Sequence, residues 1–169
     1  CKTTNIQKEP FMKFSDFVRT EAIRAELTSS DKEGVVRELV ASLVESGQLG
    51  GDDQEAIVQA VLKREELGST GIGRGIAVPH TKHPSVSQPV GTCGVSATGV
   101  DFQSLDGEQV HLFFMLISPP DQPSDHLKAL EYVSKHLQDE TFCRFLKQSR
   151  TSEDIQQILE EADNNQFAS

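Results

Sequence analysis

Residues 110–117, VHLFFMLI, form the longest apolar run of the chain, and only His111 interrupts it. The run is much too short to cross a bilayer, which requires about 20 apolar residues in a helix. A short, almost continuous apolar run is typical of a strand that is covered on both faces of a sheet. We therefore predict that residues 110–117 form a buried central strand.

Other short apolar segments precede this run, and Gly, Pro and Asp-Gly turns such as residues 105–108, LDGE, separate them. Apolar segments bounded by such turn residues predict strands. The expected strands are residues 76–79, 90–97 and 100–102.

Two helices are expected before the strands. Residues 31–47 carry apolar side chains at helical spacing, with Ser30 and Glu33 in the relation of a capping box and Gly47 as the stop. A second helix is predicted to begin at residue 52 or 53 and to end at about residue 67.

The helical pattern returns after the two prolines at 119 and 120, and three more helices are expected there. Their ranges are residues 125–138, 141–147 and 151–161. In the first of them we expect one apolar stripe, made of Leu127, Leu130, Val133 and Leu137.

This order of helices, then strands, then helices is typical of an α/β sandwich in which helices cover a mixed sheet. At 169 residues the chain has the length of one domain. We place this domain at residues 13–162 and expect residues 1–12 and 163–169 to be loose ends.

The composition is that of a soluble globular protein, with 36% hydrophobic, 25% charged and 6% aromatic residues. The formal net charge is −10, and no basic patch stands out in the sequence. Because an acidic surface repels phosphate backbones and anionic lipids, neither nucleic acid nor a membrane is expected as a partner.

The three cysteines, Cys1, Cys93 and Cys143, are odd in number, far apart and without a C-x-x-C pair. This pattern argues against a disulfide framework and a zinc knuckle, and it favours a reducing cytoplasm. No signal segment is seen at the start of the chain, and a lipidated Cys1 stays open as a minor alternative.

The segment GIGRGIAVPHT at residues 71–81 places three alternate glycines before a short apolar run that ends in Pro-His. A dinucleotide fingerprint is excluded because Ile76 stands where its third glycine is required. A nucleoside-triphosphate loop is excluded because Arg74 and Gly75 replace its Lys-Ser/Thr pair.

Pro79 fixes its own φ and favours an extended Val78, so His80 is expected at the end of a strand. A neutral imidazole is a good nucleophile near pH 7 and can accept a phosphoryl group on one ring nitrogen. Bare main-chain N–H groups would then surround the phosphoryl oxygens as an anion nest, from Gly71, Gly73 and Gly75. For a lone histidine, a plain strand end at the surface would be the better interpretation.

Residues 67–80, LGSTGIGRGIAVPH, closely resemble the active-site signature of the fructose/mannitol-type (type 2) enzyme IIA domains of the bacterial phosphoenolpyruvate-dependent phosphotransferase system. The resemblance is strongest to the nitrogen-regulatory branch, and it covers most of the chain from about residue 13 to residue 160. Its further matching segments are residues 61–66, 118–122, 126–127 and 139–143. It implies a mixed sheet flanked by helices on both faces.

The resemblance also implies roles for three side chains. His80 would carry the phosphoryl group, His126 would support it from a neighbouring position, and Arg64 would stabilise the anion with its guanidinium. Without the resemblance, His126 would be interpreted as a satisfied half-buried histidine, and Arg64 as a charge that compensates the helix dipole.

The other histidines, His83, His111 and His136, are scattered without ligand spacing, so neither a metal site nor a cofactor is expected. His136 falls off the apolar face of its helix. Two positions depart from the family pattern: Thr81 stands where Gly or Ala is usual, and Arg74 where a neutral residue such as Asn is expected.

Together these features predict a cytoplasmic phosphotransferase component, a phosphohistidine carrier. The family implies a histidine-phosphorylated carrier protein as the donor, and a protein acceptor or a regulated target downstream. Regulation is favoured over sugar uptake as the output. Two alternatives stay open: a binding module of the same fold that acts by docking alone, and the soluble IIA subunit of a fructose- or mannitol-type sugar permease.

Overall fold

The computed structural model of the protein describes residues 13–164. Its sheet is built around β5 (Val110–Ser118), which is almost entirely buried. β4 (Val90–Val100) pairs with one edge of β5 in the antiparallel direction, and β2 (Ile76–Ala77) and β3 (His80–Lys82) pair with the other edge in the parallel direction. The predicted buried central strand is therefore confirmed.

β2 and β3 together form one interrupted strand along β5. β2 lies opposite residues 112–113 and β3 opposite residues 116–118. Between the two pieces stands Pro79, which has no N–H to donate to a neighbouring strand. The strand expected at residues 76–79 therefore ends early, and His80 begins a strand instead of ending one.

At the other edge of β5, β4 is one continuous strand. Its register with β5 shifts between Val95 and Val100, and Gly99 in this stretch has a φ of +91°. The separate strand expected at residues 100–102 is therefore wrong, because a bulge of this kind lets a strand continue after a local bend.

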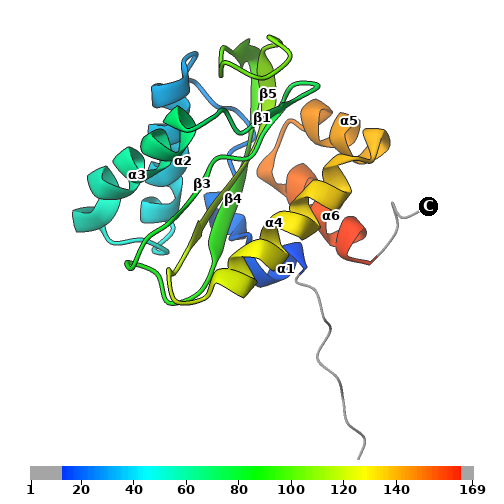
Figure 1. The fold of residues 1–169 in the computed structure, drawn as a ribbon. Helices are drawn as coiled ribbons and strands as arrows, with labels where there is room; N and C mark the ends of the chain where they lie inside the picture. Colours follow the sequence, from blue (N-terminus) through cyan, green and yellow to red (C-terminus); the bar gives the residue numbers. More distant parts are fainter. Residues whose placement is uncertain (1–12, 165–169) are drawn as a thin grey trace, which may run out of the picture.

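Two helices cover one face of the sheet (Figure 1), namely α2 (Lys32–Glu45) and α3 (Gln54–Glu66), and the short 3-10 turn η2 (Gly51–Asp53) leads into α3. They confirm the two helices expected before the strands, and Gly47, with a φ of +84°, ends α2 as predicted. The capping box of Ser30 and Glu33 is wrong. Because the N-cap is Asp31, the third helical position is Gly34, which has no side chain to complete a box.

The remaining helices lie on the opposite face (Figure 1), and they are α1 (Phe14–Phe17), α4 (Pro123–Leu137), α5 (Glu140–Gln148) and α6 (Ser152–Asp163). α4, α5 and α6 confirm the three helices expected after the prolines. The single turns α1 and η1 (Thr20–Ala22) were not expected, because so few residues show no periodicity. The mixed sheet flanked by helices on both faces is confirmed.

The buried face of α4 differs from the expected stripe at one position. Leu127 is 56% exposed, whereas its neighbour His126 is buried. His126 lies three residues before the buried Ala129 and seven before the buried Val133, so these three share one helical face. Leu127 is turned about 100° from that face.

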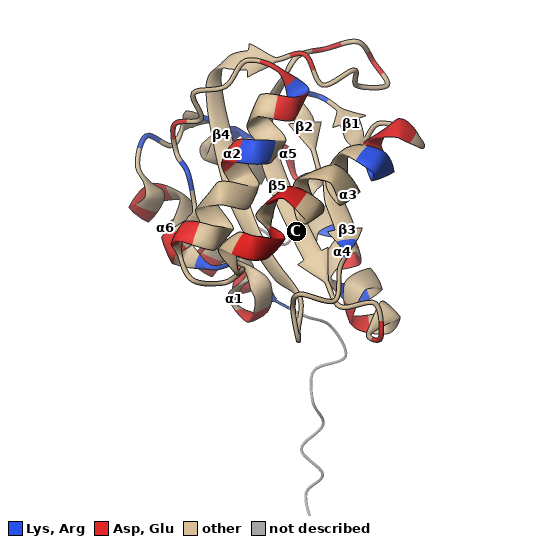
Figure 2. Ribbon diagram, turned by 90° about the vertical axis from the view of Figure 1, so that its left-hand side faces the viewer, with Lys and Arg blue, Asp and Glu red and all other residues tan. Residues whose placement is uncertain are grey.

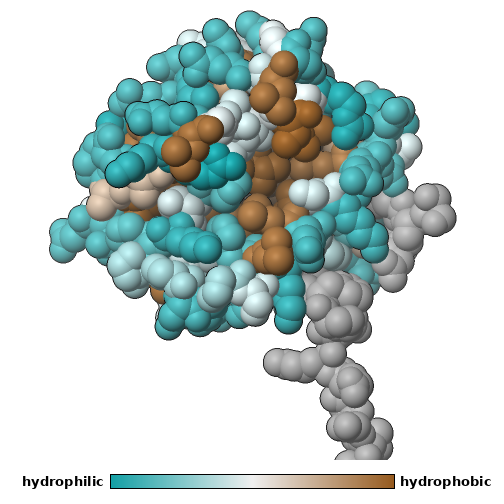
Figure 3. Space-filling view, viewed as in Figure 1, coloured by the Kyte–Doolittle hydropathy of each residue, from teal (hydrophilic) through white to brown (hydrophobic). Residues whose placement is uncertain are grey.

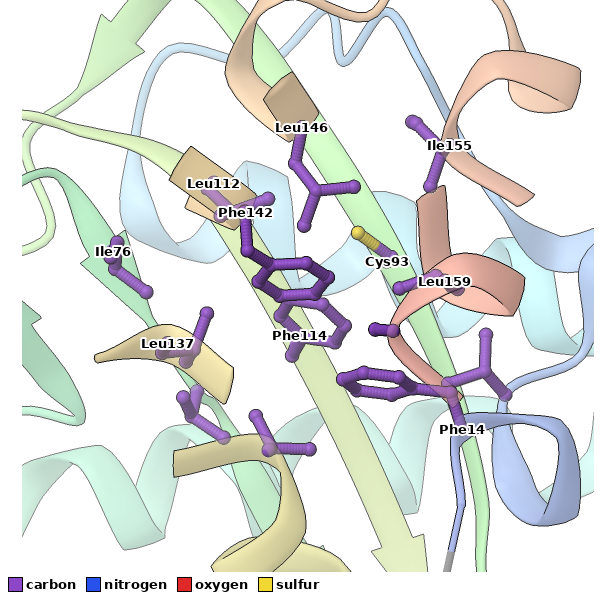
Figure 4. Close-up of a cluster of buried hydrophobic side chains, with 14 of the residues drawn as sticks. Phe14, Ile76, Cys93, Leu112, Phe114, Leu137, Phe142, Leu146, Ile155 and Leu159 are labelled. Atoms are coloured by element: carbon purple, nitrogen blue, oxygen red, sulfur yellow. The ribbon is translucent and has the colours of Figure 1, made fainter. Parts of the chain in front are cut away.

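The core divides into two clusters, one on each face of the sheet. In the cluster beneath α4, α5 and α6, the ring centroid of Phe14 lies 5.5 Å from that of Phe114 and 5.7 Å from that of Phe142. Figure 4 shows these rings with Cys93 close by. Cys93 and Cys143 are both free thiols, and burial raises the pKa of each.

The end of α6 is tied to the beginning of the described chain. The carboxylate of Asp163 accepts the N–H of Phe14 at 2.8 Å, the N–H of Ser15 at 3.0 Å and the hydroxyl of Tyr132 at 2.7 Å. Asp163, expected in a loose tail, is therefore part of the folded domain, because it satisfies the first N–H groups of α1. Asn164, also expected in that tail, is the C-cap of α6, and residues 1–12 with Cys1 and residues 165–169 lie outside the described residues.

Acidic and basic residues both occur along the outer helices (Figure 2), and among them Arg37 forms ion pairs with Glu33 and Glu55 at 2.9 and 2.7 Å. The chain as a whole has 26 Asp and Glu against 16 Lys and Arg, which leaves the surface acidic. Within residues 13–164, no helix has both the length and the apolar character needed to cross a membrane.

Candidate functional site

The break between β2 and β3 brings His80 next to α4. Alternate side chains of an extended chain share a face, and Ile76 and Val78 both belong to the core cluster beneath α4. His80 follows on that face, and its ring centroid lies 5.5 Å from that of His126, with the two rings tilted by 53°. Two histidines from distant parts of the sequence therefore form a pair.

One hydrogen bond decides the tautomer of His80. Its Nδ1 lies 2.7 Å from the carbonyl oxygen of Val78. Because a carbonyl oxygen can only accept, Nδ1 must carry the proton, and the neutral ring therefore has its free lone pair on Nε2. Burial is the largest effect and lowers the pKa of His80, whereas the Val78 hydrogen bond, the next largest, raises it. The charges of Arg64 and Lys82 lower it further, and the charge of Glu65 raises it.

His126 is the more buried partner of the pair, with 7% of its surface exposed. Its Nδ1 lies 2.6 Å from the hydroxyl oxygen of Ser118, the last residue of β5. Burial is the main cause that lowers the pKa of His126 to about 4, and the charges of His80 and Lys82 add to it. Near pH 7 His126 is therefore a neutral imidazole, anchored by Ser118.

Arg64 lies in the last turn of α3, and its side chain extends past the end of the helix. Its Nη1 donates a hydrogen bond to the carbonyl oxygen of Gly68 at 2.9 Å. Its charge also lowers the pKa of His80, so the guanidinium lies within electrostatic reach of that ring. Both interpretations of Arg64 are therefore compatible with its position: a cation at a helix end and a cation beside His80.

Lys82 is a second cation beside the histidine pair and was not among the expected site residues. It lies two residues after His80 on β3, so both side chains lie on the same side of the strand. Its charge lowers the pKa of both His80 and His126. The signal was present in the sequence: a strand that continues beyond Pro79 places residues 80 and 82 on one face.

Glu65 of α3 is a buried carboxylate that was not expected as a site residue. It helps to hold the chain at the break between β2 and β3. Glu65 is 6% exposed, accepts the N–H of Thr70 at 3.1 Å as well as its hydroxyl, and pairs with Lys32 at 3.0 Å. The carbonyl oxygen of Thr70 accepts the N–H of Val78 at 3.1 Å, and Val78 in turn holds His80. A carboxylate on the inward face of α3 was the sequence signal for such a buried network.

The glycines at 73 and 75 do not lie near His80. β1 (Gly71–Gly73) folds back on β2, and the turn between them has a positive φ at Gly73, Arg74 and Gly75, of 100°, 60° and 78°. His80 lies about 16 Å farther along the extended chain than Gly75. The expected anion nest around the phosphoryl group therefore has no support from these positions, which serve the tight turn of a hairpin.

Gly71 has a different structural reason. It pairs with Ala77, and a Cβ atom added there would lie 3.1 Å from Cα of Ser104 and closer still to its hydroxyl oxygen. Glycine is therefore needed because two backbone segments approach each other closely.

The other three histidines have local partners. Nδ1 of His83 lies 2.8 Å from the hydroxyl oxygen of Ser85, and Nδ1 of His111 lies 2.9 Å from the carbonyl oxygen of Ser96. His136 does not fall off the packed face as expected, because its ring lies against three aromatic side chains, those of Phe14, Tyr132 and Phe142. Within residues 13–164, no group of three or more His, Cys, Asp and Glu side chains could hold a metal ion.

Comparison with known proteins matches the chain to one family. The family model described as "Phosphoenolpyruvate-dependent sugar phosphotransferase system, EIIA 2" matches residues 16–162. The nitrogen regulatory protein of Bradyrhizobium diazoefficiens is 35% identical over 148 residues, which are 88% of this chain and 95% of that protein.

In a second relative, the matching region is only a small part of a longer protein. The fructose-specific EIIABC component of Bacillus subtilis is 37% identical over 152 residues, which are 90% of this chain but only 24% of that protein. Among solved structures, the nitrogen regulatory protein IIA-Ntr from Neisseria meningitidis is similar with a TM-score of 0.78 at 25% identity, covering 86% of this chain and 98% of that one.

Proposed function

Because this chain belongs to the EIIA 2 family of the phosphoenolpyruvate-dependent sugar phosphotransferase system, we propose that it carries a phosphoryl group on His80. His126 and Arg64 have supporting roles in this proposal. The observation that carries it is the 2.7 Å contact between Nδ1 of His80 and the carbonyl oxygen of Val78. This bond leaves Nε2 as the nucleophilic nitrogen.

The transfer step follows from this tautomer. The lone pair on Nε2 of His80 forms the new P–N bond while the P–N bond of a phosphohistidine on the donor protein breaks. The electron pair of that broken bond returns to the donor imidazole. The proton on Nδ1 of His80 remains on the bond to Val78, so no base has to remove it.

The charges around His80 suit both states of the ring. A lowered pKa keeps the ring neutral near pH 7, and only the neutral ring has a free lone pair. After transfer the phosphoryl group brings close to two negative charges into an acidic domain. Arg64 and Lys82 supply the nearby positive charges, and the guanidinium of Arg64 can hold two phosphoryl oxygens at once.

A protein donor and a protein acceptor require a surface that binds proteins. Five large hydrophobic side chains of the described residues are exposed: Leu67, Ile72, Leu105, Leu127 and Phe145. Leu127 follows the supporting histidine, and Leu67 lies three residues after Arg64. Figure 3 shows hydrophobic residues gathered near the centre of one face and surrounded by hydrophilic ones, the arrangement typical of protein-binding surfaces.

A regulatory output is the more specific part of the proposal. The similarity to nitrogen regulatory proteins from two organisms supports it. The sequence identity of this chain to the fructose-specific relative, 37%, is close to its identity to the nitrogen regulatory protein of Bradyrhizobium diazoefficiens, 35%. We place the protein in the cytoplasm, where the two free buried thiols would persist.

Incubation with phosphoenolpyruvate, the general phosphotransferase and its histidine-containing carrier tests the proposal. We expect one acid-labile phosphate per chain, none on His80→Ala, and normal labelling on His83→Ala as the matched histidine control. Persistent labelling of His80→Ala, or an acid-stable phosphate, would show that His80 is not the acceptor. A folded wild-type chain that is never labelled would favour a module that acts by docking alone.

A further inference from the structure

A cavity of about 370 Å³ lies far from His80 along the same edge of the sheet. Ile76 of β2 and Cys143 of α5 form part of its wall, and three cations line it: Arg74, Arg144 and Lys147. β2 pairs with residues 112–113, whereas His80 pairs with Leu116, so the cavity is separate from the histidine pair.

The three cations of this cavity have no carboxylate partner within the described residues. Nζ of Lys147 donates to the carbonyl oxygen of Arg74 at 2.6 Å, and the guanidinium of Arg144 lies 5.6 Å from the ring centre of Phe145. Glu140 is the one carboxylate in the cavity wall, so the wall keeps an excess of positive charge. In a chain of net charge −10, such a local excess attracts an anion.

The backbone of Arg74 has a φ of +60°, a conformation that residues other than glycine rarely adopt. Three contacts fix it: its N–H donates to Asp106 at 3.0 Å, its Nη2 to the carbonyl oxygen of Leu137 at 2.8 Å, and its carbonyl oxygen accepts from Lys147. Glycine would fit this turn without strain. A strained arginine whose backbone is held by Asp106 and Lys147, and whose side chain is held by α4, points to a use for that side chain.

A second cavity, of about 530 Å³, adjoins the first and shares Arg74 and Lys147 with it. The rest of its wall differs, because it adds the carboxylates of Asp106 and Glu108 and the neutral polar side chain of Gln109, with His111 beside them. Carboxylates repel a phosphate group but accept hydrogen bonds from hydroxyl groups. The two cavities therefore differ in the chemical groups that each can bind.

We propose that these cavities together bind a small phosphomonoester with a hydroxylated organic part. The phosphate group lies among Arg74, Arg144 and Lys147, where guanidinium forks match phosphate oxygens. The hydroxyl groups lie against the acidic wall of the second cavity. The volumes are within the range of small-molecule sites.

Calorimetric titration of the full chain tests this site, with glucose 6-phosphate, inorganic phosphate and glucose as probes. We expect saturable one-to-one binding of glucose 6-phosphate, at least tenfold tighter than that of inorganic phosphate, and no binding of glucose. Arg144→Gln and Lys147→Gln should each weaken binding by about tenfold or more, the range for a lost charged hydrogen bond. Lys63→Gln, an exposed lysine on the opposite face, is the matched control.

Arg144→Gln is the safer of the two variants, because Lys147 also holds the hairpin through Arg74. His80→Ala should bind glucose 6-phosphate as the wild type does, which separates this site from the acceptor histidine. Absence of saturable binding, equal weakening in Lys63→Gln, or loss of binding in His80→Ala alone would overturn the proposal. Equal affinity for inorganic phosphate would overturn the assignment of a phosphomonoester.

Discussion

The imidazole rings of His80 and His126 lie 5.5 Å apart, centroid to centroid, although one begins β3 and the other lies in α4. His80 is anchored by the carbonyl oxygen of Val78, and His126 by the hydroxyl of Ser118. Each ring therefore has one nitrogen fixed by the protein and one nitrogen left for other partners.

His126→Ala should slow phosphoryl transfer to His80 by about a hundredfold, the effect expected of a positioned hydrogen-bonding group. The fold should persist, because only one end of α4 loses packing. Rapid-quench measurements of transfer in both directions check this, with circular dichroism for the fold and His83→Ala as the control. Unchanged kinetics in both directions would make His126 a structural residue.

Substitutions of Arg64 separate charge from geometry. Arg64→Lys keeps the charge but loses the fork of donors, so transfer should be intermediate, whereas Arg64→Gln should transfer poorly. The difference should narrow as salt rises, because salt screens charges that are open to solvent. Stability should change by only about 0.3 to 1 kcal/mol. If Arg64→Gln unfolds the domain while its folded fraction transfers normally, Arg64 is structural.

The stability of the domain should depend on pH through the protonation of His126. Its pKa of about 4 in the folded chain lies below the ordinary value of 6.5, so the folded state binds fewer protons than the unfolded state between these values. The free energy of unfolding should therefore fall as pH falls from about 6.5 to 4, by about 3 kcal/mol from this group. Urea unfolding at several pH values measures it. His126→Gln should remove this component, and identical slopes in both proteins would contradict the assignment.

Glu65→Gln should destabilise the domain by about 3 kcal/mol, because it leaves the ammonium group of Lys32 without its buried partner. It should also lower the pKa of His80 further, since the negative charge of Glu65 raises that pKa in the wild type. Urea unfolding and NMR titration of the His80 ring check the two effects. Glu66→Gln, at an exposed neighbouring position, is the control and should change neither.

Gly75→Ala tests whether the hairpin glycines have a structural role or bind the phosphoryl group. Because Gly75 has a φ of +78°, alanine should cost about 1 to 2 kcal/mol of stability. Transfer to His80 in the folded protein should be unchanged. Gly50→Ala is the matched control, since Gly50 has a φ of −77° and a Cβ there meets no atom closer than 3.6 Å. Normal stability with lost transfer would restore the anion nest.

Local patterns in the sequence predicted most of the secondary structure. The apolar run at 110–117 and the helical spacing in α2 and α3 were readable because burial on one face leaves a periodic trace in the sequence. The continuation of β4 through its bulge was not readable, because a shift of register depends on the partner strand. The same holds for Asp163, whose partners in α1 are distant in the sequence.

The sequence alone also determined the candidate acceptor, since His80 follows a recognisable signature, and it named His126 and Arg64 through the same resemblance. Only the tertiary structure decided which groups meet. In the fold His126 lies next to His80, and Lys82 is a second cation beside this pair. The turn at residues 73–75 lies away from the two histidines. The tertiary structure also decided which ring nitrogen of His80 keeps a free lone pair, because the tautomer depends on the one hydrogen bond that the folded backbone offers to Nδ1.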